Sequence, residues 1–143
     1  ECPMHHVSEL MIDTVFTLQP SDTLNDARTL MKLAKIRNTP VTDDEGNFVG
    51  LITNRDLLAC TISRLADIDE KVQEEIDTAI RVSDVMQCDV DCVTPDTPLR
   101  EAARLLFEHK CGCLPVLDGR KLVGILTEAD FLRLAMILLD KNI

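Results

Sequence analysis

The stretches FVGLITNRDLL at residues 48–58 and LVGILTEADFL at residues 122–132 decide the fold. Both contain Val-Gly, two aliphatic residues, Thr, two variable residues and Asp. A short apolar run that ends in Thr and leads into a second apolar run is typical of a strand that passes directly into a helix. Either the fold requires this junction twice, or something binds to it twice.

The similarity between the two stretches extends along nearly the whole chain. VSELM at residues 7–11 returns as VSDVM at residues 82–86, a shift of 75 residues, whereas Gly50 and Gly124 are related by a shift of 74. The missing residue falls between DDEGN and DGRK, which both read as turns, where insertions and deletions cost least. We therefore predict an internal duplication.

Each copy predicts the element order β-α-β-β-α. A short β-rich piece, TVFTL at 14–18 or DVDCV at 89–93, precedes a helix with apolar residues at helical spacing. Two strands joined by a Gly-containing acidic turn follow as a hairpin. The last helix of each copy begins at Thr53 or Thr127. The fold class is therefore α/β (α+β), with two pseudo-symmetric repeats.

The repeats divide the chain into three parts. We assign residues 1–66 to the first repeat, 67–81 to a connecting helix and 82–143 to the second repeat. The connector is charged but has apolar residues at helical spacing, and we expect it to lie on the second repeat. One repeat alone has a thin core, so we expect the two to pack together as one module.

The composition limits the classes of partner. A formal charge of −10 and a pI near 4.6 argue against sequence-independent binding to nucleic acid or anionic lipid. No apolar run reaches the ~18 residues that a membrane span needs, and no secretory signal opens the chain. The cysteines are spread among apolar segments, which favours a reducing, cytoplasmic location. Because Glu1 stands in place of an initiator Met, we expect a piece of a longer protein.

The duplicated motifs resemble the CBS (cystathionine-β-synthase) domain, in the tandem form called a Bateman module. The residues that carry the resemblance are VSELM and VSDVM, the Pro-Val strand starts at Pro40 and Pro115, and GLITNRD and GILTEAD. The resemblance implies two repeats packed sheet to sheet with two clefts between them, and frequent homodimers. It also implies a regulatory sensor of adenosine-containing ligands, alone or attached to enzymes, channels or transporters.

Two interpretations of Thr-x-x-Asp compete. Thr at a strand-to-helix junction with an acidic residue three positions later forms a capping box, which is purely structural. The same helix start suits phosphate, and Asp accepts hydrogen bonds from ribose hydroxyls. In the CBS family the matching Thr contacts phosphate and the matching Asp contacts ribose. Capping alone would favour Glu or Gln, so Asp in both copies favours sugar binding.

The resemblance also implies which residues share a cleft, because the family builds each cleft from both repeats. Thr127 and Asp130 would face Val15, Phe16, Ile36, Arg37, Asn38 and Thr39. Thr53 and Asp56 would face Val90, Asp91, Cys111, Gly112 and Cys113.

Charged residues near the motifs bear on the ligand. Arg55 and Arg37 are the candidate phosphate ligands, since a guanidinium pairs bidentately with phosphate, although each could equally be a solvated surface Arg. Asp91 stands where small or apolar residues are common and would repel a phosphate, and Glu128 replaces Asn54. AMP, ADP or an S-adenosylmethionine-like compound therefore fits at least as well as ATP, which would need Mg²⁺.

Two other functions stay open. The first is a CBS-fold dimerisation or scaffold module with empty clefts; the apolar helix from Glu128 to about Asp140 favours an intermolecular contact, with an effector protein or a second copy. The second is a cysteine-based redox or metal sensor that uses Cys2, His5 and His6 with Cys88, Cys92, Cys111 or Cys113, although CPMHH matches no known metal-finger spacing. Nothing places a nucleophile beside a base, so we predict no enzyme and no catalytic cofactor.

Overall fold

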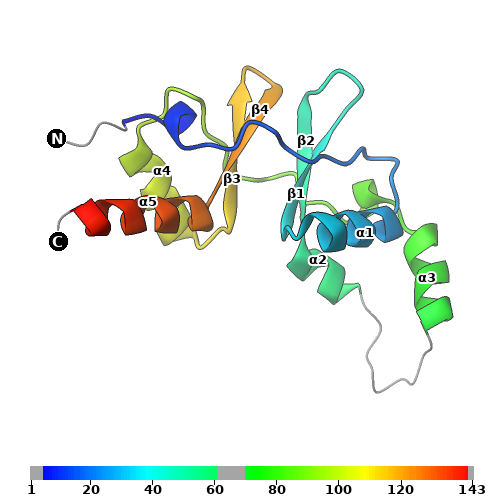
Figure 1. Ribbon diagram of the computed structural model, residues 1–143. Helices are drawn as coiled ribbons and strands as arrows, with labels where there is room; N and C mark the ends of the chain where they lie inside the picture. Colours follow the sequence, from blue (N-terminus) through cyan, green and yellow to red (C-terminus); the bar gives the residue numbers. More distant parts are fainter. Residues whose placement is uncertain (1–4, 61–69, 142–143) are drawn as a thin grey trace. The chain divides into compact units, whose positions relative to one another are not determined.

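The computed structural model describes residues 5–60 and 70–141, and it contains helices and two small sheets (Figure 1). The elements in chain order are η1 (Val7–Glu9), α1 (Leu24–Ala34), β1 (Asn38–Thr42), β2 (Phe48–Thr53), α2 (Asn54–Ala59), α3 (Glu70–Ala79), η3 (Val82–Asp84), α4 (Leu99–His109), β3 (Cys113–Asp118), β4 (Lys121–Thr127) and α5 (Glu128–Lys141). The chain divides into two compact units. One is Phe16–Val90, and the other is Glu1–Val15 together with Asp91–Ile143.

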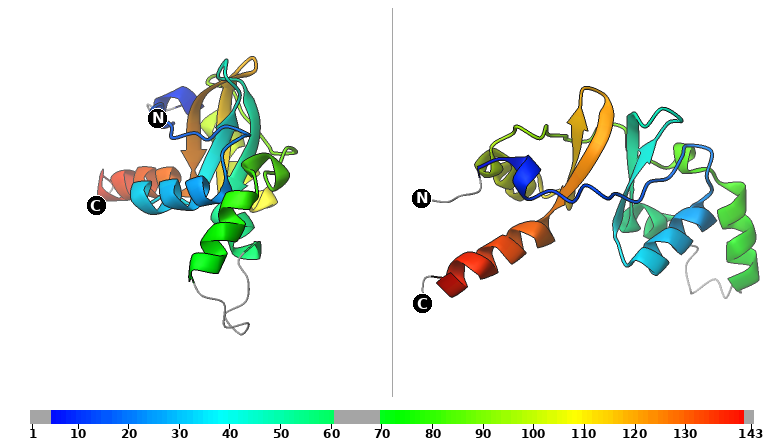
Figure 2. Two further views of the ribbon diagram at one scale, coloured as in Figure 1. Left: turned by 90° about the vertical axis from the view of Figure 1, so that its right-hand side faces the viewer. Right: turned by 45° about the horizontal axis from the view of Figure 1, so that its top comes forward.

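Each unit is built on one antiparallel hairpin. In β1–β2, Asn38 pairs with Thr53, and in β3–β4, Cys113 pairs with Thr127. Both ladders shift register just after a core Val, between Val41 and Thr42 in one and between Val116 and Leu117 in the other. The duplicated sequence therefore folds into two copies of the same hairpin, as predicted, and each hairpin passes into a helix, α2 or α5 (Figures 1 and 2).

The β pieces predicted at 14–18 and 89–93 are not strands. Each makes a single parallel bridge, from Leu18 to Val41 and from Val93 to Val116. Leu18 N donates to Pro40 O (3.1 Å), and the next ladder donor, two residues on, would be Pro20. Pro95 occupies the equivalent place after Val93. Because proline has no N–H, the ladder ends after one residue in both units.

Each V-S-x-x-M segment packs in the compact unit that holds the hairpin of the other sequence repeat. Val7 is fully buried in the core of the unit that holds β3 and β4, and Val82 is fully buried in the core of the unit that holds β1 and β2. Ile12 exchanges two 2.9 Å backbone hydrogen bonds with Ile125, and Gln87 exchanges two 2.8 Å bonds with Leu51. The compact units are thus not the sequence repeats, because each borrows its first segment from the other copy.

This exchange explains the Gly of the duplicated motif. A Cβ on Gly50 would lie 2.6 Å from Met86 Sδ and 3.1 Å from Gln87 O. A Cβ on Gly124 would lie 2.6 Å from Met11 Sδ and 3.0 Å from Ile12 O. Real Cβ atoms do not approach so closely, so glycine lets the V-S-x-x-M segment lie directly on the hairpin.

The connecting segment forms helix α3, but the prediction that it lies on the second repeat is wrong. It packs on α1, in the unit Phe16–Val90. Asp77 is 3% exposed. It accepts from Gln73 Nε2 at 3.0 Å and pairs with Arg28 Nε at 2.8 Å. A buried carboxylate needs such partners, and α1 supplies the charged one. The helical spacing predicted an apolar face but could not name its partner.

Among the described helices, none combines the length and the apolar content that a bilayer span requires.

Candidate functional site

The first Thr-x-x-Asp motif forms the junction between β2 and α2. Thr53 is the N-cap of α2, and its Oγ1 accepts from Asp56 N at 3.2 Å. Thr53 N donates to Asp56 Oδ2 at 2.8 Å, which completes a capping box. Asn54 N, the next donor, is satisfied by Arg37 O at 2.7 Å. The motif therefore stops the strand, starts the helix and fixes one carboxylate oxygen.

The second oxygen of the Asp56 carboxylate has a separate partner. Gln87 Nε2 donates to Asp56 Oδ1 at 3.0 Å and to Oδ2 at 3.2 Å. Gln87 directly follows VSDVM and is exposed, and Asp56 is half-buried. A neutral amide on an accessible carboxylate oxygen is a contact that another hydrogen-bond donor can replace.

The second motif, between β4 and α5, differs in its surroundings. Thr127 N donates to Asp130 Oδ2 at 2.8 Å, and Thr127 Oγ1 lies 3.2 Å from the same oxygen. Asp130 is fully buried, and its Oδ1 is held by the guanidinium of Arg133, one helical turn on. The acceptor that a ribose would need is therefore covered in this conformation.

A third Thr-x-x-Asp box, which sequence analysis did not single out, starts α1. Thr23 N donates to Asp26 Oδ2 at 2.9 Å, and Asp26 N donates to Thr23 Oγ1 at 3.2 Å. No ligand role was predicted here. The expectation that capping alone favours Glu or Gln therefore does not hold in this chain, and the box geometry by itself does not identify a binding site.

The hairpin register shows which Thr-x-x-Asp motif lies beside the start of β1 and which lies beside the start of β3. Because Asn38 pairs with Thr53 and Cys113 with Thr127, residues 36–39 lie beside the first motif and residues 111–113 beside the second. The resemblance grouped each of these segments with the motif of the other repeat, and that grouping stays a prediction. Antiparallel pairing brings the start of one strand to the end of the next, so this neighbourhood was readable from the hairpin alone.

The remaining predicted residues differ in exposure. Thr39 and Cys113 are buried, and no partner for the Thr39 hydroxyl lies within residues 5–60 and 70–141. The half-buried members of the predicted set are Val15, Ile36, Asn38, Val90 and Cys111. The exposed members are Phe16, Arg37, Arg55 and Gly112.

Asp91 has a partner that the sequence did not reveal. His109 Nδ1, at the end of α4, lies 2.5 Å from Asp91 Oδ2, and both side chains are about half exposed. No role in the site was predicted for His109. It is the last residue of α4, and the helix places its imidazole beside the Asp91 carboxylate. The carboxylate that we expected to repel phosphate is thus engaged by an imidazole.

Three of the cysteines lie in surroundings that disfavour the thiolate. Burial raises the pKa of Cys92 and Cys111, and it raises that of Cys113 to about 12. A reactive or metal-binding cysteine needs the opposite shift, toward the thiolate. In the part of the chain that the structure describes, Cys60, Cys88, Cys111 and Cys113 are free thiols, and no three His, Cys, Asp or Glu side chains are placed to hold a metal ion. Cys2 lies outside the described residues.

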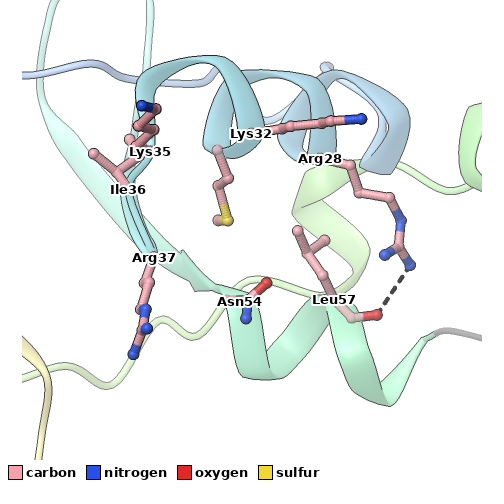
Figure 3. A pocket seen from close by; sticks show the side chains of 8 residues that line it. Arg28, Lys32, Lys35, Ile36, Arg37, Asn54 and Leu57 are labelled. Atoms are coloured by element: carbon pink, nitrogen blue, oxygen red, sulfur yellow. Dashed lines mark hydrogen bonds between the residues drawn. The ribbon is translucent and has the colours of Figure 1, made fainter.

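A pocket of about 430 Å³ opens between α1 and α2 (Figure 3). Its lining is formed by Arg28, Met31, Lys32, Lys35, Ile36, Arg37, Asn54 and Leu57. Of these residues, sequence analysis had predicted only Ile36 and Arg37 as ligand contacts. The missed signal was the helical spacing of Arg28, Lys32 and Lys35, which puts three cations on neighbouring turns.

Comparison with known proteins places these features in a family. The CBS domain model matches residues 7–62 and again residues 82–137. Inosine-5'-monophosphate dehydrogenase of Methanocaldococcus jannaschii is 34% identical over 87% of this chain, which spans 22% of that enzyme. A CBS domain-containing protein of Dictyostelium discoideum is 33% identical, with 94% of this chain and 93% of that protein covered.

Solved structures agree with the sequence matches. The CBS-pair protein CBSX2 from Arabidopsis thaliana superposes with a TM-score of 0.82 at 32% identity, covering 94% of this chain and 96% of that one. A second CBSX2 structure, in complex with AMP, gives a TM-score of 0.78 at 33% identity and covers 94% and 98%. The duplicated motif, the twin hairpins and these matches lead to one conclusion: the chain belongs to the CBS domain family and carries two CBS domains in tandem, as a Bateman module.

Proposed function

We propose that this module is a regulatory sensor that binds an adenosine-containing ligand at its Thr-x-x-Asp junctions, with the first junction as the main site. The proposal is supported by family membership and by the AMP complex of CBSX2, a relative at 33% identity. The ligand class is AMP, ADP, ATP or an S-adenosylmethionine-like compound. Mg²⁺ would accompany the more highly charged nucleotides.

The observation that carries the proposal is the state of the Asp56 carboxylate. One oxygen is fixed by Thr53, and the other accepts only from the amide of Gln87 among the described residues. Ribose hydroxyls are donors that can take the place of that amide. Asp130 would first have to release Arg133, whose side chain is 61% exposed and free to swing into solvent. The two sites should therefore differ in affinity.

The same contact suggests how binding is signalled. Gln87 belongs to the segment that lies on β2 through Leu51, and this segment follows α3 and η3. A ligand that displaces the Gln87 side chain changes what holds this segment on its hairpin. It can shift a conformational equilibrium only by its difference in affinity for the two states.

Self-association is the proposed output. The apolar residues Leu132, Met136, Ile137, Leu138 and Leu139 on α5 are between 37% and 66% exposed. An exposed apolar surface of this kind is typical of a protein–protein interface. A homodimer through α5 would carry the signal to a second copy or to an effector protein.

The test is a thermal-shift screen of AMP, ADP, ATP, S-adenosylmethionine and NAD, with and without Mg²⁺. A ligand at a hundred times its Kd should stabilise the protein by about 2.7 kcal/mol. Asp56→Asn keeps the shape of the side chain and should abolish most of the shift. Asp26→Asn alters the same capping box at the start of α1 and should leave the shift unchanged, so it is the matched control. Equal shifts in both variants would refute the role of Asp56.

The alternative is a scaffold that uses the fold for dimerisation alone, and the exposed α5 residues favour it. In that case no adenosyl compound shifts the melting temperature, whereas Met136→Glu converts a dimer to a monomer in light scattering. A monomer in the unmodified protein would remove the support for this alternative.

A further inference from the structure

The hydroxyl of Thr53 is already engaged within the chain. A threonine hydroxyl carries one proton, and Thr53 Oγ1 donates it to Asp56 Oδ2 at 3.0 Å. The same hydroxyl oxygen accepts from Asp56 N at 3.2 Å. Thr53 therefore has no proton left for a phosphate, and an anion placed beside it would lie next to the Asp56 carboxylate, which carries the same sign of charge.

The backbone amides at the start of α2 are engaged as well. Asn54 N, the first of them, donates to Arg37 O at 2.7 Å, and Asp56 N, the third, donates to Thr53 Oγ1 at 3.2 Å. Phosphate sites at helix starts depend on amides that point at the ligand and have no protein acceptor. The helix is also only six residues long, so few peptide dipoles add up at its start. This junction therefore offers a phosphate little to bind.

The same arrangement occurs at a helix start for which no ligand was predicted. At the start of α1, Thr23 Oγ1 donates to Asp26 Oδ2 at 3.1 Å, and Leu24 N donates to Ile80 O at 3.0 Å. The threonine hydroxyl and the first amide thus have the same partners at α1 as at α2. We conclude that both groups serve the fold at these helix starts.

The junction between β4 and α5 has the same contacts and an additional negative charge. Thr127 Oγ1 lies 3.2 Å from Asp130 Oδ2, and Glu128 N donates to Gly112 O at 3.4 Å. The first residue of α5 is Glu128, which places a second carboxylate beside this junction. The guanidinium of Arg133 is engaged by Asp130. A phosphate is therefore disfavoured at the second junction too.

One oxygen of the Asp56 carboxylate stays accessible to a ligand. Oδ2 accepts from Thr53 N at 2.8 Å and from Thr53 Oγ1 at 3.0 Å, which occupies both of its lone pairs. Among the described residues, Oδ1 accepts only from Gln87 Nε2, at 3.0 Å. A ribose has two adjacent hydroxyls, but only Oδ1 has room for a new donor. One hydroxyl of the sugar is therefore enough for this contact.

Two exposed arginines, Arg37 and Arg55, are the cations closest in sequence to this junction. Within residues 5–60 and 70–141, neither forms an ion pair. An exposed guanidinium that no neighbour holds in place attracts an anion weakly, and salt screens the attraction. The formal charge of −10 on the whole chain opposes it. The arginines therefore give phosphate only a small, salt-sensitive advantage.

We propose that the first junction recognises the nucleoside part of its ligand and makes no fixed contact with a phosphate. This rests on the adenosyl site proposed at Asp56, and it narrows the ligands to adenosine and 5′-substituted adenosines without a phosphate. One ribose hydroxyl donates to Asp56 Oδ1 in place of Gln87 Nε2. Thr53 is a positioning residue, because it holds the carboxylate in place and does not touch the ligand.

The experiment is a calorimetric titration of the intact chain with adenosine and AMP. In about 0.5 M NaCl, where the Debye length is about 4 Å, the two Kd values should agree within about threefold. The same titration with deoxynucleosides tests the sugar contact. Both 2′-deoxyadenosine and 3′-deoxyadenosine should bind within about threefold of adenosine, whereas 2′,3′-dideoxyadenosine should bind at least about tenfold more weakly, because it has no hydroxyl for Oδ1.

A variant of Thr53 separates positioning from phosphate binding. Thr53→Val removes the hydroxyl at nearly constant volume and loosens the Asp56 carboxylate, so adenosine and AMP should weaken by the same factor. Thr53→Ser keeps the hydroxyl and should restore both affinities. Thr23→Val makes the same change at the start of α1 and should alter neither affinity, so it is the matched control. A loss of affinity for AMP alone in Thr53→Val would overturn the proposal.

The ligand series needs no variant and is decisive by itself. AMP that binds at least about tenfold tighter than adenosine in high salt would overturn this proposal and leave the adenosyl site standing. Monodeoxy nucleosides that bind as weakly as the dideoxy nucleoside would show that Asp56 holds both hydroxyls, which also contradicts it. If none of the adenosine compounds binds, the adenosyl site itself is refuted, and this proposal with it.

Discussion

The two compact units share a scaffold and differ in what surrounds it. Both hairpins have the same register, and both have a glycine covered by a Met from the other repeat. Yet Asp56 is half-buried and held by the neutral Gln87, whereas Asp130 is fully buried and held by Arg133. Duplication has therefore preserved the residues that position the junction, while the residues around each junction have diverged.

The charge of the neighbouring surface differs in the same way. Beside the first hairpin, Lys32 and Arg37 help to line a basic pocket, and their equivalents beside the second are Phe107 and Gly112. Phe107, at the position equivalent to Lys32, is 84% exposed, so its side chain does not contribute to the core of the second unit. The comparison separates what the fold requires, which is repeated, from what a ligand or partner requires, which is not.

The largest effect should come from the repeated glycines, and it should be equal in the two units. Gly50→Ala and Gly124→Ala each place a Cβ 2.6 Å from a Met Sδ and near 3 Å from a backbone oxygen. Overpacking at a site where the backbone cannot move should lower the free energy of unfolding by about 2–3 kcal/mol, measured in urea.

Shortening the covering side chain is the control for this prediction. In Gly50→Ala/Met86→Ala the contact with Sδ is gone, so the double variant should lose less stability than the two single variants added together. A large cost at Gly50 with none at Gly124 would break the equivalence of the two scaffolds.

The three Thr-x-x-Asp motifs should differ in how much each contributes to the free energy of unfolding. Asp130→Ala leaves the Thr127 N–H without its buried acceptor, so we expect a loss of about 2 kcal/mol. Asp56→Ala, at a half-buried position, should cost about 1 kcal/mol, and Asp26→Ala, at an exposed position, no more than that. Thermal unfolding of the three variants gives the order. Equal losses at Asp130 and Asp26 would show that burial does not matter here.

Much of the fold could be predicted from the sequence because the sequence encodes the same elements twice. The shift between copies predicted the hairpins and the helices that begin after Thr53 and Thr127. It did not reveal the exchange of the V-S-x-x-M segments, since a repeat pattern fixes local elements but not which copy supplies each contact. The single-residue bridges at Leu18 and Val93 were also missed, although the following prolines hold the physical reason. Both errors concern pairings between distant parts of the chain.

The candidate site was less predictable for a related reason. Thr53 with Asp56 and Thr127 with Asp130 were correctly placed at strand–helix junctions. Their partners Gln87 and Arg133 were not identified, because a polar side chain on an exposed surface gives no sequence signal of what it touches. The basic pocket was missed although its cations lie on α1 and on the turn that follows it, because the spacing of Arg28, Lys32 and Lys35 does not reveal that Asn54 and Leu57 of α2 lie opposite them.

The pH dependence of stability should come in part from the second unit. Burial raises the pKa of Cys113 to about 12 from a reference value of 9.0, so the folded state keeps its proton at a pH where the unfolded state loses it. The contribution of Cys113 to the free energy of unfolding is therefore constant below pH 9. It falls between pH 9 and 12, by up to about 1.4 kcal/mol per pH unit.

Urea unfolding at pH 8 and pH 10 measures this effect. Cys113→Ala should reduce the difference between the two pH values, and Asn38→Ala, at the equivalent position of the first unit, is the control. The equivalent residue in the first unit is Asn38, which does not titrate. An unchanged pH dependence in Cys113→Ala would contradict the burial of this thiol.

The smallest effect should be a gain in stability. Thr39 is fully buried, and its hydroxyl has no hydrogen-bond partner in the described part of the chain, whereas the equivalent Leu114 is apolar and also fully buried. Thr39→Val removes the hydroxyl at nearly constant volume and should raise the free energy of unfolding by about 1 kcal/mol, measured in urea. Thr39→Ser keeps the hydroxyl and should not. If Thr39→Val stabilises the protein but weakens AMP binding, the hydroxyl is retained for the ligand at the expense of the fold. If it stabilises the protein and leaves binding unchanged, Thr39 belongs to the scaffold, as Leu114 does.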